Sequence, residues 1–380
     1  MKRARVVHLT SVHTALDPRI YYKESRSLAR AGYEVTIVVP HTSDFVADNI
    51  HIKAVPAESG RIGRVTRAAW RIYREARRLD ADLYHFHDPE LIPVGLLLRA
   101  HGKQVIYDIH EDLPKGILSK HYLPVWSRSL ISLLARSCES STCGFFSALV
   151  PVTASIAERF TSINRRIVTV QNYPSSNEAS SNCQPVPYAA RQASVAYVGG
   201  ITGQRGIREM VLAMALLPEA LSATLDLAGN ELPDDVHPEE LYRHPGWKRV
   251  RHHGILDHPR VACLLNRVRA GLVLIHPRSS FLESLPVKMF EYMNAGLPVI
   301  ASDFPSWRPI IEDNHCGLLV DPLDPAAIAG AIEYLLTHAD EAEEMGRCGR
   351  TAIQEHYNWE SQERRLVDLY AELLEPVCAE

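Results

Sequence analysis

Short apolar runs rich in β-branched residues alternate with longer helical patterns along the first half of the chain. Strand-like runs that are apolar throughout and separated by helices are typical of a parallel sheet covered on both faces. The strands predicted in this half are RVVHL (5–9), EVTIVV (34–39), ADLYHFH (81–87), QVIYDIH (104–110), ALVPVT (148–153) and RIVTVQN (166–172). The stretch 174–193 is rich in Pro, Ser and Asn and has the composition of an interdomain linker.

The same alternation restarts after this linker, and two amphipathic helices are predicted beyond the last strand. The strands predicted here are SVAYVGG (194–200), ATLDLAGN (223–230), VRHHGIL (250–256), AGLVLIH (270–276), GLPVIAS (296–302) and CGLLVDP (316–322). We therefore predict an α/β protein of two doubly wound, Rossmann-like domains, in agreement with a length of 380 residues.

The pattern also sets the expected domain limits. The N-terminal domain covers 1–173, the linker 174–193, the C-terminal domain 194–355 and a C-terminal helix 356–380. The pattern leaves open whether this helix crosses back to the N-terminal domain. Ligands of such domains bind at the carboxyl ends of the strands, here expected in a crevice where the two domains face each other.

The composition is that of a globular protein, with 46% hydrophobic and 23% charged residues. A net charge of −4 argues against a nucleic-acid partner, which would call for a strongly basic face. Seven cysteines without a CxxC pair are interpreted as reduced thiols. The longest apolar run, LIPVGLLL (91–98), is far too short to span a membrane. The start of the chain breaks its apolar run too early for a signal peptide, so we expect a cytoplasmic protein.

The run ESLPVKMFEYMNAGLPVIAS (283–302) combines two glutamates with a helix start. Pro286 suits the first turn of a helix because its missing N–H is not needed there. We expect a helix from Pro286 to Asn294, with Glu283 in the loop before it and Glu291 inside it. Unpaired N–H groups at a helix start can hold phosphate, and carboxylates can accept hydrogen bonds from vicinal hydroxyls. These features together indicate a nucleotide sugar.

This run resembles the donor-site signature of the retaining glycosyltransferase family 4, which has the GT-B fold. In that family a glutamate, seven intervening residues and a second glutamate precede a Gly-Leu-Pro-Val strand. The resemblance implies that Glu291 binds the ribose diol and that Glu283 contacts hydroxyls of the donor sugar. It further implies that the backbone N–H groups of Leu285 and Val287 lie near the phosphates.

A second run, YVGGITGQRGIREMVLAM (197–214), resembles the other signature of this family, a strand and glycine turn followed by a basic residue. The resemblance places Gly199 and Gly200 at the donor and makes Arg205 the cation that neutralises the departing diphosphate. The family's usual cation directly after the first glycine is replaced here by Gly200. Lys288 or Arg278 is then expected to supply the second positive charge, and the sequence does not choose between them.

Candidate acceptor-side residues lie in the N-terminal domain. The run VIYDIHEDLP (105–114) resembles the family's acceptor-side segment, with His110 and Glu111 at the end of a strand. The resemblance makes His110 a positioning and electrostatic group, although a buried structural histidine is also compatible with the pattern. Asp17 and Arg19, in the first strand-to-helix loop, are assigned more loosely to the acceptor or the phosphates.

His85 and His87 alternate along one predicted strand with the spacing of metal ligands. A tetrahedral site needs further ligands, and the sequence identifies no third or fourth one. We therefore interpret this pair as lining of the crevice, with His87 on the acceptor side. No metal ion and no cofactor other than the donor substrate are expected.

Two segments are candidates for contact with an anionic membrane surface. In the helix predicted over 60–79, five arginines gather on one side, opposite Val65, Ala69, Ile72 and Leu79. The arginines are Arg64, Arg67, Arg71, Arg74 and Arg78. The segment 117–137 adds Tyr122, Trp126 and several leucines. A solvated arginine face is the alternative, so peripheral association with the inner face of the cell membrane is an expectation only.

The sequence thus favours a retaining, metal-independent transferase that moves a hexosyl unit from a UDP- or GDP-sugar to a carbohydrate or lipid-linked saccharide. The alternatives are a nucleotide-sugar epimerase or phosphorylase of the same fold, and a non-catalytic sugar-binding module. The sugar, the base, the acceptor and the oligomeric state cannot be read from the sequence.

Overall fold

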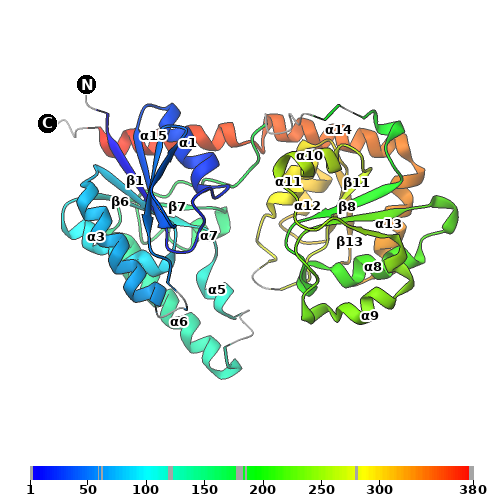
Figure 1. Ribbon diagram of the computed structural model, residues 1–380, viewed down its shortest axis with the longest axis horizontal. Coiled ribbons are helices and arrows are strands. Elements are labelled where there is room, and N and C mark those ends of the chain that lie inside the picture. Colours follow the sequence, from blue (N-terminus) through cyan, green and yellow to red (C-terminus); the bar gives the residue numbers. More distant parts are fainter. Residues whose placement is uncertain are drawn as a thin grey trace. The chain divides into compact units, whose positions relative to one another are not determined.

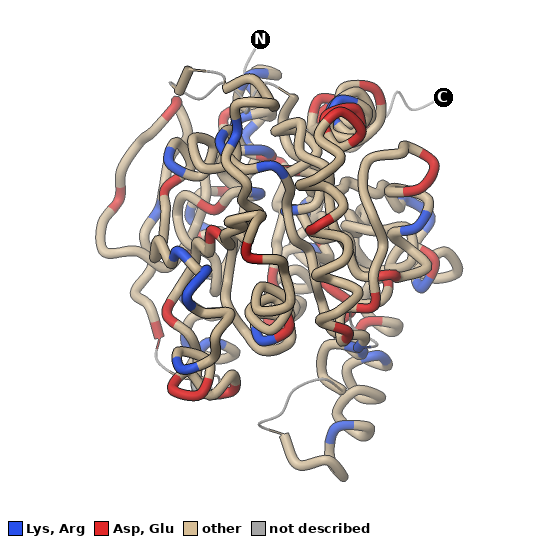
Figure 2. The backbone as a smooth tube through the Cα atoms, turned by 90° about the vertical axis from the view of Figure 1, so that its right-hand side faces the viewer, with Lys and Arg blue, Asp and Glu red and all other residues tan. Residues whose placement is uncertain are grey.

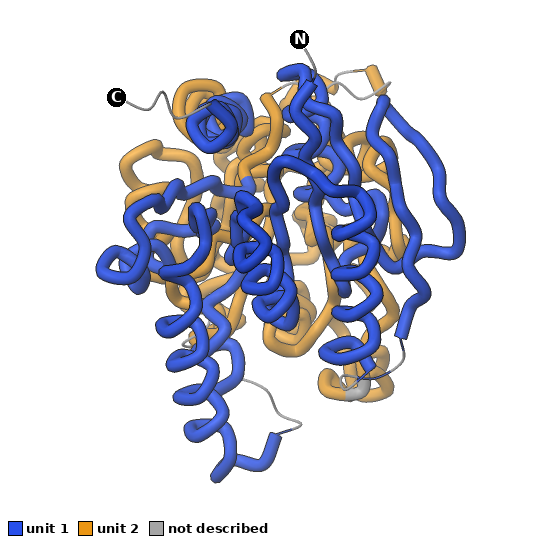
Figure 3. The backbone as a smooth tube through the Cα atoms, turned by 90° about the vertical axis from the view of Figure 1, so that its left-hand side faces the viewer, with its two compact units in different colours: residues 1–172, 359–380 blue, residues 173–358 orange. Residues whose placement is uncertain are grey.

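The computed structural model describes residues 3–58, 60, 63–118, 123–176, 183–184, 186–278 and 281–375. The chain divides into two compact units, here called unit 1 (residues 1–172 with 359–380) and unit 2 (residues 173–358) (Figure 3). The C-terminal segment therefore belongs to the same unit as the first half of the chain. The predicted linker 174–193 belongs to unit 2 and its residues 177–182 and 185 lie outside the described ranges.

Unit 1 contains a seven-stranded sheet in the order β3-β4-β2-β1-β5-β6-β7 (Figure 1). All neighbouring strands are parallel except β3 and β4, which pair antiparallel. The strands are β1 (Arg5–Leu9), β2 (Glu34–Pro40), β3 (Phe45–Ala47), β4 (Ile50–Val55), β5 (Leu83–Phe86), β6 (Gln104–Ile109) and β7 (Ala148–Pro151). The central strands β1, β5 and β6 are buried along almost their whole length because helices cover both faces of the sheet.

Two helical layers cover this sheet. Helix α15, the π-helix η1 and α1 pack on one face, and α3, α4 and α7 pack on the other. The helices of unit 1 are η1 (Ile20–Ser25), α1 (Arg26–Arg30), η2 (Arg64–Ala68), α3 (Ala69–Leu79), η3 (Pro89–Leu91), α4 (Ile92–Ala100), α5 (Leu113–Leu118), α6 (Val125–Thr142), η4 (Cys143–Phe145), α7 (Ala154–Glu158) and α15 (Trp359–Leu374). Helix α6 extends away from the sheet of this unit (Figures 1 and 3).

Unit 2 contains a six-stranded parallel sheet in the order β10-β9-β8-β11-β12-β13. Its strands are β8 (Ser194–Val198), β9 (Thr224–Ala228), β10 (Val250–His252), β11 (Ala270–Val273), β12 (Val299–Ser302) and β13 (Gly317–Val320). Helices α8 and α13 pack on one face, and α10, α11 and α12 on the other. The order reverses at β8, so the strand ends of β8 and β11 form the switch point at which doubly wound sheets bind ligands.

The helices of unit 2 are mostly short, with two long ones near its end. They are η5 (Tyr188–Ala190), η6 (Gly203–Arg205), α8 (Ile207–Leu216), η7 (Glu219–Leu221), η8 (Asp234–Val236), α9 (Pro238–Arg243), η9 (Pro245–Arg249), α10 (His258–Leu265), α11 (Val287–Asn294), α12 (Arg308–Glu312), α13 (Pro325–Thr337) and α14 (Ala339–Glu355). Across the described residues, none of the helices combines the length and the apolar character that a membrane span requires.

The sequence pattern predicts most strands correctly. It differs from the structure at one predicted strand, at two short strands, in the number of C-terminal helices and at the start of α11. Residues 166–172 form no strand; the segment makes one isolated bridge, between Ile167 and Leu149 of β7. The short strands β3 and β4 were not predicted, because their runs are brief and interrupted by polar residues. Three helices rather than two follow β13. In addition, α11 begins at Val287, with Pro286 at the N-cap rather than in the first turn.

The cysteines correct a further expectation. Cys183 and Cys263 form a disulfide, with their Cα atoms 5.6 Å apart, so the prediction of seven reduced thiols is wrong. The two residues are separated by 80 positions in the sequence, and only the fold brings the chain before β8 next to α10. Cys138, Cys143, Cys316 and Cys348 are free, and Cys378 lies outside the described residues.

Candidate functional site

A glycine turn follows β8 at the switch point of the unit 2 sheet. Gly199 has a φ of +132°, and a Cβ atom at this position would lie 2.9 Å from Nζ of Lys288. A side chain at Gly200 would meet the guanidinium of Arg205 at 3.6 Å. The turn therefore needs glycine at Gly199 for its backbone and for space, and it brings two cations next to an open main chain.

Tyr292 joins α11 to the strand that precedes this turn. The backbone N–H of Val198 donates to the hydroxyl of Tyr292 over 2.8 Å, which joins the end of β8 to the helix. The ring of Tyr292 lies against Gly271 of β11, where any side chain would collide with it. These contacts explain why Gly199 and Lys288, which are far apart in sequence, meet in the fold. The sequence did not single out Tyr292, because a tyrosine inside an amphipathic helix is typical of the hydrophobic core.

Lys288 is buried, and within the described part of the chain its ammonium has no hydrogen-bond partner. Nζ lies 4.0 Å from the centre of the Tyr197 ring, which offers a cation–π contact. Burial, and after it the nearby charge of Arg205, lowers the pKa of Lys288 to about 7, although Glu291 acts in the opposite direction. An unpaired buried ammonium beside a second cation is a costly arrangement, and an anion bound at the turn would relieve it.

Arg205 is the last residue of η6 and is half-buried. The next residue, Gly206, has a φ of 68°, and a Cβ there would come within 2.5 Å of the carbonyl oxygen of Leu274. This close approach allows η6 to turn directly into α8 beside the strand ends. Arg205 is thereby held next to Gly199 and Gly200, as the sequence predicted for the three residues, and the role in donor binding stays a prediction.

The segment before α11 carries the remaining predicted donor residues. Leu285, Pro286 and Val287 are half-buried, and the first N–H groups of α11 have no partner within the helix. Glu291 is half-buried one turn after Lys288, and Glu283 is exposed in the turn that precedes the helix. The helix start therefore offers N–H groups, a cation and a carboxylate in one place, which suits a diphosphate attached to a hydroxyl-bearing group.

In unit 1, His110 follows β6 and keeps 22% of its side chain exposed. Its Nε2 lies 3.2 Å from Oδ2 of Asp108 and 3.2 Å from Nδ1 of His87. Burial alone would raise the pKa of Asp108, but Arg19 and the neighbouring histidines hold it well below its usual value. A buried carboxylate thus orients the accessible imidazole of His110. The sequence missed Asp108, whose only signal was an acid inside an apolar strand.

The other residues predicted on the acceptor side, Arg19, Asp17 and Glu111, lie in different environments from that of His110. Arg19 is buried and engaged by two carboxylates, donating to both oxygens of Asp108 over 3.0 and 3.1 Å and lying 2.9 Å from Glu24. It is therefore not placed to touch a ligand, contrary to expectation. Asp17 accepts backbone N–H groups of Arg19 and Ile20 at the start of η1, so its carboxylate stabilises the loop. Glu111 is exposed.

His87 is also buried, only 2% exposed, so it does not line an open surface. Its neighbours include His8 and His85, whose ring centroids lie 5.2 and 4.8 Å from its own. The interpretation of the histidine pair as crevice lining is therefore wrong for these buried rings. The sequence could not group them because His8 comes from β1 and the others from the end of β5.

Comparison with known protein families gives two matches that together cover most of the chain. The family described as "Glycosyltransferase Family 4" matches residues 18–173, and "Glycosyl transferases group 1" matches residues 186–352. Glycogen synthase of Mycobacterium tuberculosis is 24% identical over 190 residues, 48% of this chain. The match spans only 45% of that protein. Phosphatidyl-myo-inositol mannosyltransferase of Mycolicibacterium smegmatis is 23% identical over 90% of this chain and 86% of its own length.

Solved structures show the same fold over nearly the whole chain. Sucrose-phosphate synthase from Thermosynechococcus elongatus aligns with a TM-score of 0.76 at 18% identity, covering 98% of this chain and 99% of its own. The Anabaena protein HepE, solved in complex with UDP and glucose, aligns with a TM-score of 0.73 at 13% identity, covering 97% of this chain and 100% of its own. At these identities the alignments bear on the fold alone.

Proposed function

Because the chain belongs to glycosyltransferase family 4 and has the GT-B fold of its structural neighbours, we propose that it transfers a hexosyl unit from a nucleotide-diphosphate sugar to a hydroxyl acceptor. The observation that carries the proposal is the buried, unpaired ammonium of Lys288 beside Gly199 and Arg205. A buried, unpaired ammonium beside a second cation and a glycine turn favours the binding of an anion. A nucleoside diphosphate supplies that anion.

The two cations fit the chemistry of the leaving group. Cleavage of the bond between sugar and phosphate builds negative charge on the diphosphate, and preorganised positive groups stabilise that charge in the transition state. Arg205 offers a planar fork to two phosphate oxygens, and Lys288 a point charge at the glycine turn. Together with the N–H groups at the start of α11, Arg205 and Lys288 are proposed to stabilise the diphosphate charge that a divalent metal ion stabilises in other sites. We propose that the donor needs no metal ion here.

We propose that the reaction retains the anomeric configuration of the donor sugar. The acids predicted at the sugar, Glu283 and Glu291, lie in the turn before α11 and inside that helix, where the proposed role is to accept hydrogen bonds from hydroxyls. We therefore propose attack by the acceptor on the face from which the diphosphate leaves. The departing phosphate takes the proton of the acceptor, while Arg205 holds the leaving group.

His110 is proposed to act on the acceptor side. It keeps an exposed edge, and the buried carboxylate of Asp108 holds its Nε2. The role is that of a positioning and electrostatic group rather than of a nucleophile. UDP in the HepE complex and the inositol lipid named for the mycobacterial mannosyltransferase make a UDP-sugar and a lipid-linked acceptor reasonable starting choices, and a GDP-sugar stays the alternative from the sequence.

A membrane-facing surface is proposed on α6. Its residues Trp126, Leu130, Leu133 and Leu134 lie on one side of the helix and are 81%, 54%, 60% and 60% exposed. The tube of this helix carries few charged positions (Figure 2). Exposed apolar side chains in one stripe are typical of an interfacial helix. We propose that this face meets the surface that carries a lipid-linked acceptor; Tyr122 lies outside the described residues.

The arginine stripe of the sequence is weaker than expected. Arg67 and Arg71 both pair with Glu58, over 3.3 and 2.5 Å, which neutralises part of the charge. On the side opposite the arginines, Val65 is 53% exposed, whereas Ala69 and Ile72 are buried. The arginines are therefore proposed only as an auxiliary contact with anionic lipid.

The test is a panel of nucleotide sugars incubated with the protein, with and without saccharide acceptors, followed by measurement of released nucleoside diphosphate. A transferase releases nucleotide from one donor and makes a longer saccharide. An epimerase changes the donor sugar without needing an acceptor, a phosphorylase needs only phosphate, and a binding module releases nothing. Analysis of the anomeric configuration of the product separates a retaining from an inverting reaction.

A further inference from the structure

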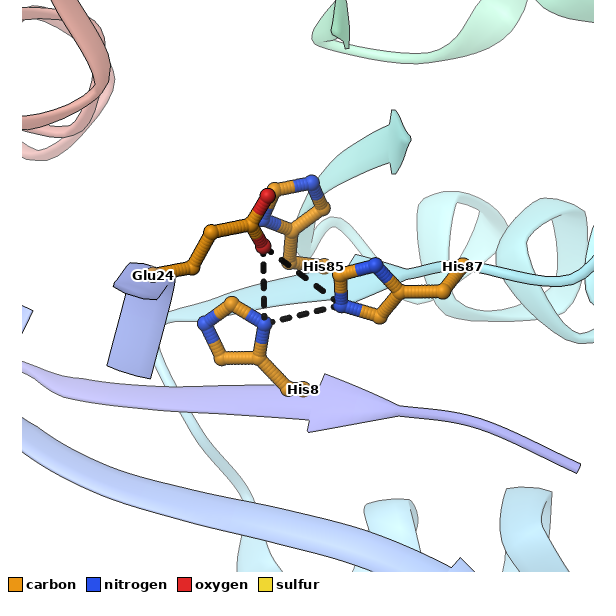
Figure 4. A group of neighbouring side chains, drawn as sticks. All are labelled: His8, Glu24, His85 and His87. Carbon is orange, nitrogen blue, oxygen red and sulfur yellow. Dashed lines mark hydrogen bonds and ion pairs between the residues drawn. The ribbon is translucent and has the colours of Figure 1, made fainter. Parts of the chain in front are cut away.

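Four buried side chains in unit 1 meet at one point: His8, Glu24, His85 and His87, here called the His3Glu cluster (Figure 4). His8 lies on β1 opposite His85 on β5, Glu24 belongs to η1, and His87 directly follows β5. Each side chain offers one potential ligand atom, and these atoms all lie within 4.8 Å of one another. None of the proposed donor or acceptor residues except His87 belongs to this cluster.

The separations between these atoms match those around a bound metal ion. Nδ1 of His8 lies 2.9 Å from Nε2 of His87 and 3.8 Å from Oε2 of Glu24. Nε2 of His87 lies 3.9 Å from Oε2 of Glu24. Metal–nitrogen bonds of about 2.0–2.1 Å in a tetrahedron put neighbouring ligand atoms roughly 3.3 Å apart. Small side-chain movements would therefore bring the three atoms into a coordination shell.

The cluster also contains polar atoms that lack the partners a buried atom requires. Among the described residues, neither carboxylate oxygen of Glu24 has a hydrogen bond, although Oε1 is ion-paired with Arg19. Nε2 of His85 likewise has none. Buried polar atoms in native proteins are nearly always satisfied. Oε2 of Glu24 and Nε2 of His85 are thus available as ligands.

The second ring nitrogen of each histidine meets a hydrogen-bonding group on the far side of the cluster. Nδ1 of His85 lies 2.8 Å and Nε2 of His8 3.4 Å from the hydroxyl of Tyr370. Nδ1 of His87 lies 3.2 Å from Oδ2 of Asp108. Metal-ligating histidines regularly donate their other N–H to a carboxylate or similar acceptor, which fixes the tautomer. All three histidines therefore have the outer contacts that ligands need.

The charge balance favours a cation as well. Two buried carboxylates, Glu24 and Asp108, face the single guanidinium of Arg19. The cluster thus calls for one more positive charge, which either a proton or a metal ion can supply.

We propose that the His3Glu cluster binds a divalent transition-metal ion, best matched by Zn²⁺, as a closed structural site. Three imidazoles and one carboxylate are ligands that Zn²⁺ accepts, and burial on all sides leaves no open position for substrate. The ion would join β1, β5 and η1 within unit 1. It would also fix the proton of His87 on Nδ1, so that Asp108 accepts it beside His110. The ion thereby positions His110 and takes no part in the reaction.

A second grouping, His87 with Asp108 and His110, is the nearest competitor within the described residues. Both carboxylate oxygens of Asp108 already accept hydrogen bonds from Arg19, so they are less able to bind a metal ion. Nε2 of His87 also points to His8 rather than to this group. The two groupings predict different ligands and can be separated by mutation.

The first experiment needs no variant. The protein is purified without chelator or metal-affinity resin, dialysed against metal-free buffer, and its metal content measured by mass spectrometry. We expect about one Zn²⁺ per chain that only a strong chelator removes, and a visible spectrum of tetrahedral Co²⁺ after replacement. A metal-free protein that binds neither Zn²⁺ nor Co²⁺ at micromolar concentration would overturn the proposal, and a proton would then be the charge that balances the cluster.

The second experiment assigns the ligands. Glu24→Gln keeps the shape of the side chain and removes the charge, so we expect affinity for Zn²⁺ to fall by more than about 100-fold. Tyr370→Phe removes an outer contact and should cost roughly 10- to 100-fold. His110→Ala is the matched control and should keep the ion. Loss of the ion in His110→Ala with retention in Glu24→Gln would overturn the assignment. If Glu24→Gln fails to fold, Tyr370→Phe and His110→Ala still decide, because Tyr370 contacts His8 and His85, which the competing grouping lacks, whereas His110 belongs to the competing grouping.

Discussion

The ammonium nitrogen of Lys288 lies 4.0 Å from the centre of the Tyr197 ring, and the hydroxyl of that ring donates to the carbonyl oxygen of Gly200 over 2.7 Å. The glycine turn and the cation are therefore held by the same side chain. The ring attracts the ammonium but cannot replace the hydrogen bonds that burial removes. Burial, followed by the nearby charge of Arg205, lowers the pKa of Lys288 to about 7, which makes its protonation sensitive to a bound anion.

The affinity for nucleoside diphosphate should depend on pH through Lys288. The free protein loses the Lys288 proton as pH rises through about 7, whereas a bound diphosphate favours the charged form. The Kd should therefore rise by up to about tenfold per pH unit above 7. Calorimetric titration with UDP and GDP across this range checks the prediction. In Lys288→Met the affinity should be low and nearly independent of pH, and a wild-type Kd that is flat between about pH 7 and 9 would contradict it.

The lowered pKa of Lys288 also makes the free energy of unfolding depend on pH. The direction is opposite to that of a lysine whose pKa is raised by a salt bridge. The pKa of Lys288 is about 7 in the folded protein and 10.5 in an unfolded chain, so the unfolded state binds more protons between these values. The contribution of this residue to stability should therefore grow as pH rises from 7 towards 10.5.

Arg205→Ala should lower kcat by roughly 100-fold, because one preorganised charge at a leaving group is worth about that much. KM for the donor should change less than kcat, since the charge matters most as the bond breaks. Steady-state rates with the active donor measure both constants. Arg208→Ala, one turn away on the exposed side of α8, is the control and should behave as wild type. An unchanged kcat in Arg205→Ala would move the role to Lys288 or Arg278.

Glu291→Ala should raise the donor KM strongly or abolish turnover while leaving the fold intact. Loss of a carboxylate that accepts diol hydrogen bonds leaves donor hydroxyls unpaired in the complex, whereas a half-buried position adds little to the core. Circular dichroism and donor kinetics check the two parts. Glu312→Ala, an exposed glutamate on α12, serves as the control. Normal kinetics in Glu291→Ala would remove it from the donor site.

Much of this arrangement could be predicted from the sequence, and the reasons lie in particular residues. Apolar runs located most strands, because strands buried on both faces show uninterrupted hydrophobicity, as in β2 and β8. The donor segment, whose role stays a prediction, was singled out because Glu283, Pro286 and Glu291 lie close together in the sequence and resemble a family signature. Arg205 was singled out through a second signature.

The rest depends on contacts between distant parts of the chain. The sequence did not choose between Lys288 and Arg278 as the second cation, and only the fold, in which Tyr292 joins α11 to the end of β8, brings Lys288 next to Gly199. The His3Glu cluster joins β1, η1 and β5, and the sequence showed only the pair on β5. Arg19 was expected near a ligand because a loop arginine gives no sign that Asp108, 89 residues away, will bury it.

The apolar face of α6 predicts binding to anionic vesicles. Wild-type protein should pellet with phosphatidylglycerol vesicles at low salt and less at physiological salt, since screening weakens the auxiliary arginines. The triple variant Trp126→Ser, Leu130→Ser, Leu134→Ser should lose binding at any salt. Charge reversal at Arg67, Arg71 and Arg74 should remove only the salt-dependent part. If wild-type protein stays in the supernatant at low salt, membrane contact by α6 is wrong.

The central claim is that a nucleotide sugar gives up its sugar to an acceptor while Arg205 and Lys288 hold the diphosphate. The most direct measurement counts nucleoside diphosphate released and sugar transferred in the same reaction, with the donor labelled in its sugar. We expect the amounts of released nucleoside diphosphate and transferred sugar to be equal and to depend on an acceptor. Release and transfer should nearly disappear in a variant that combines Arg205→Ala with Lys288→Met. Donor turnover without sugar in a new product, or full activity in that double variant, would contradict it.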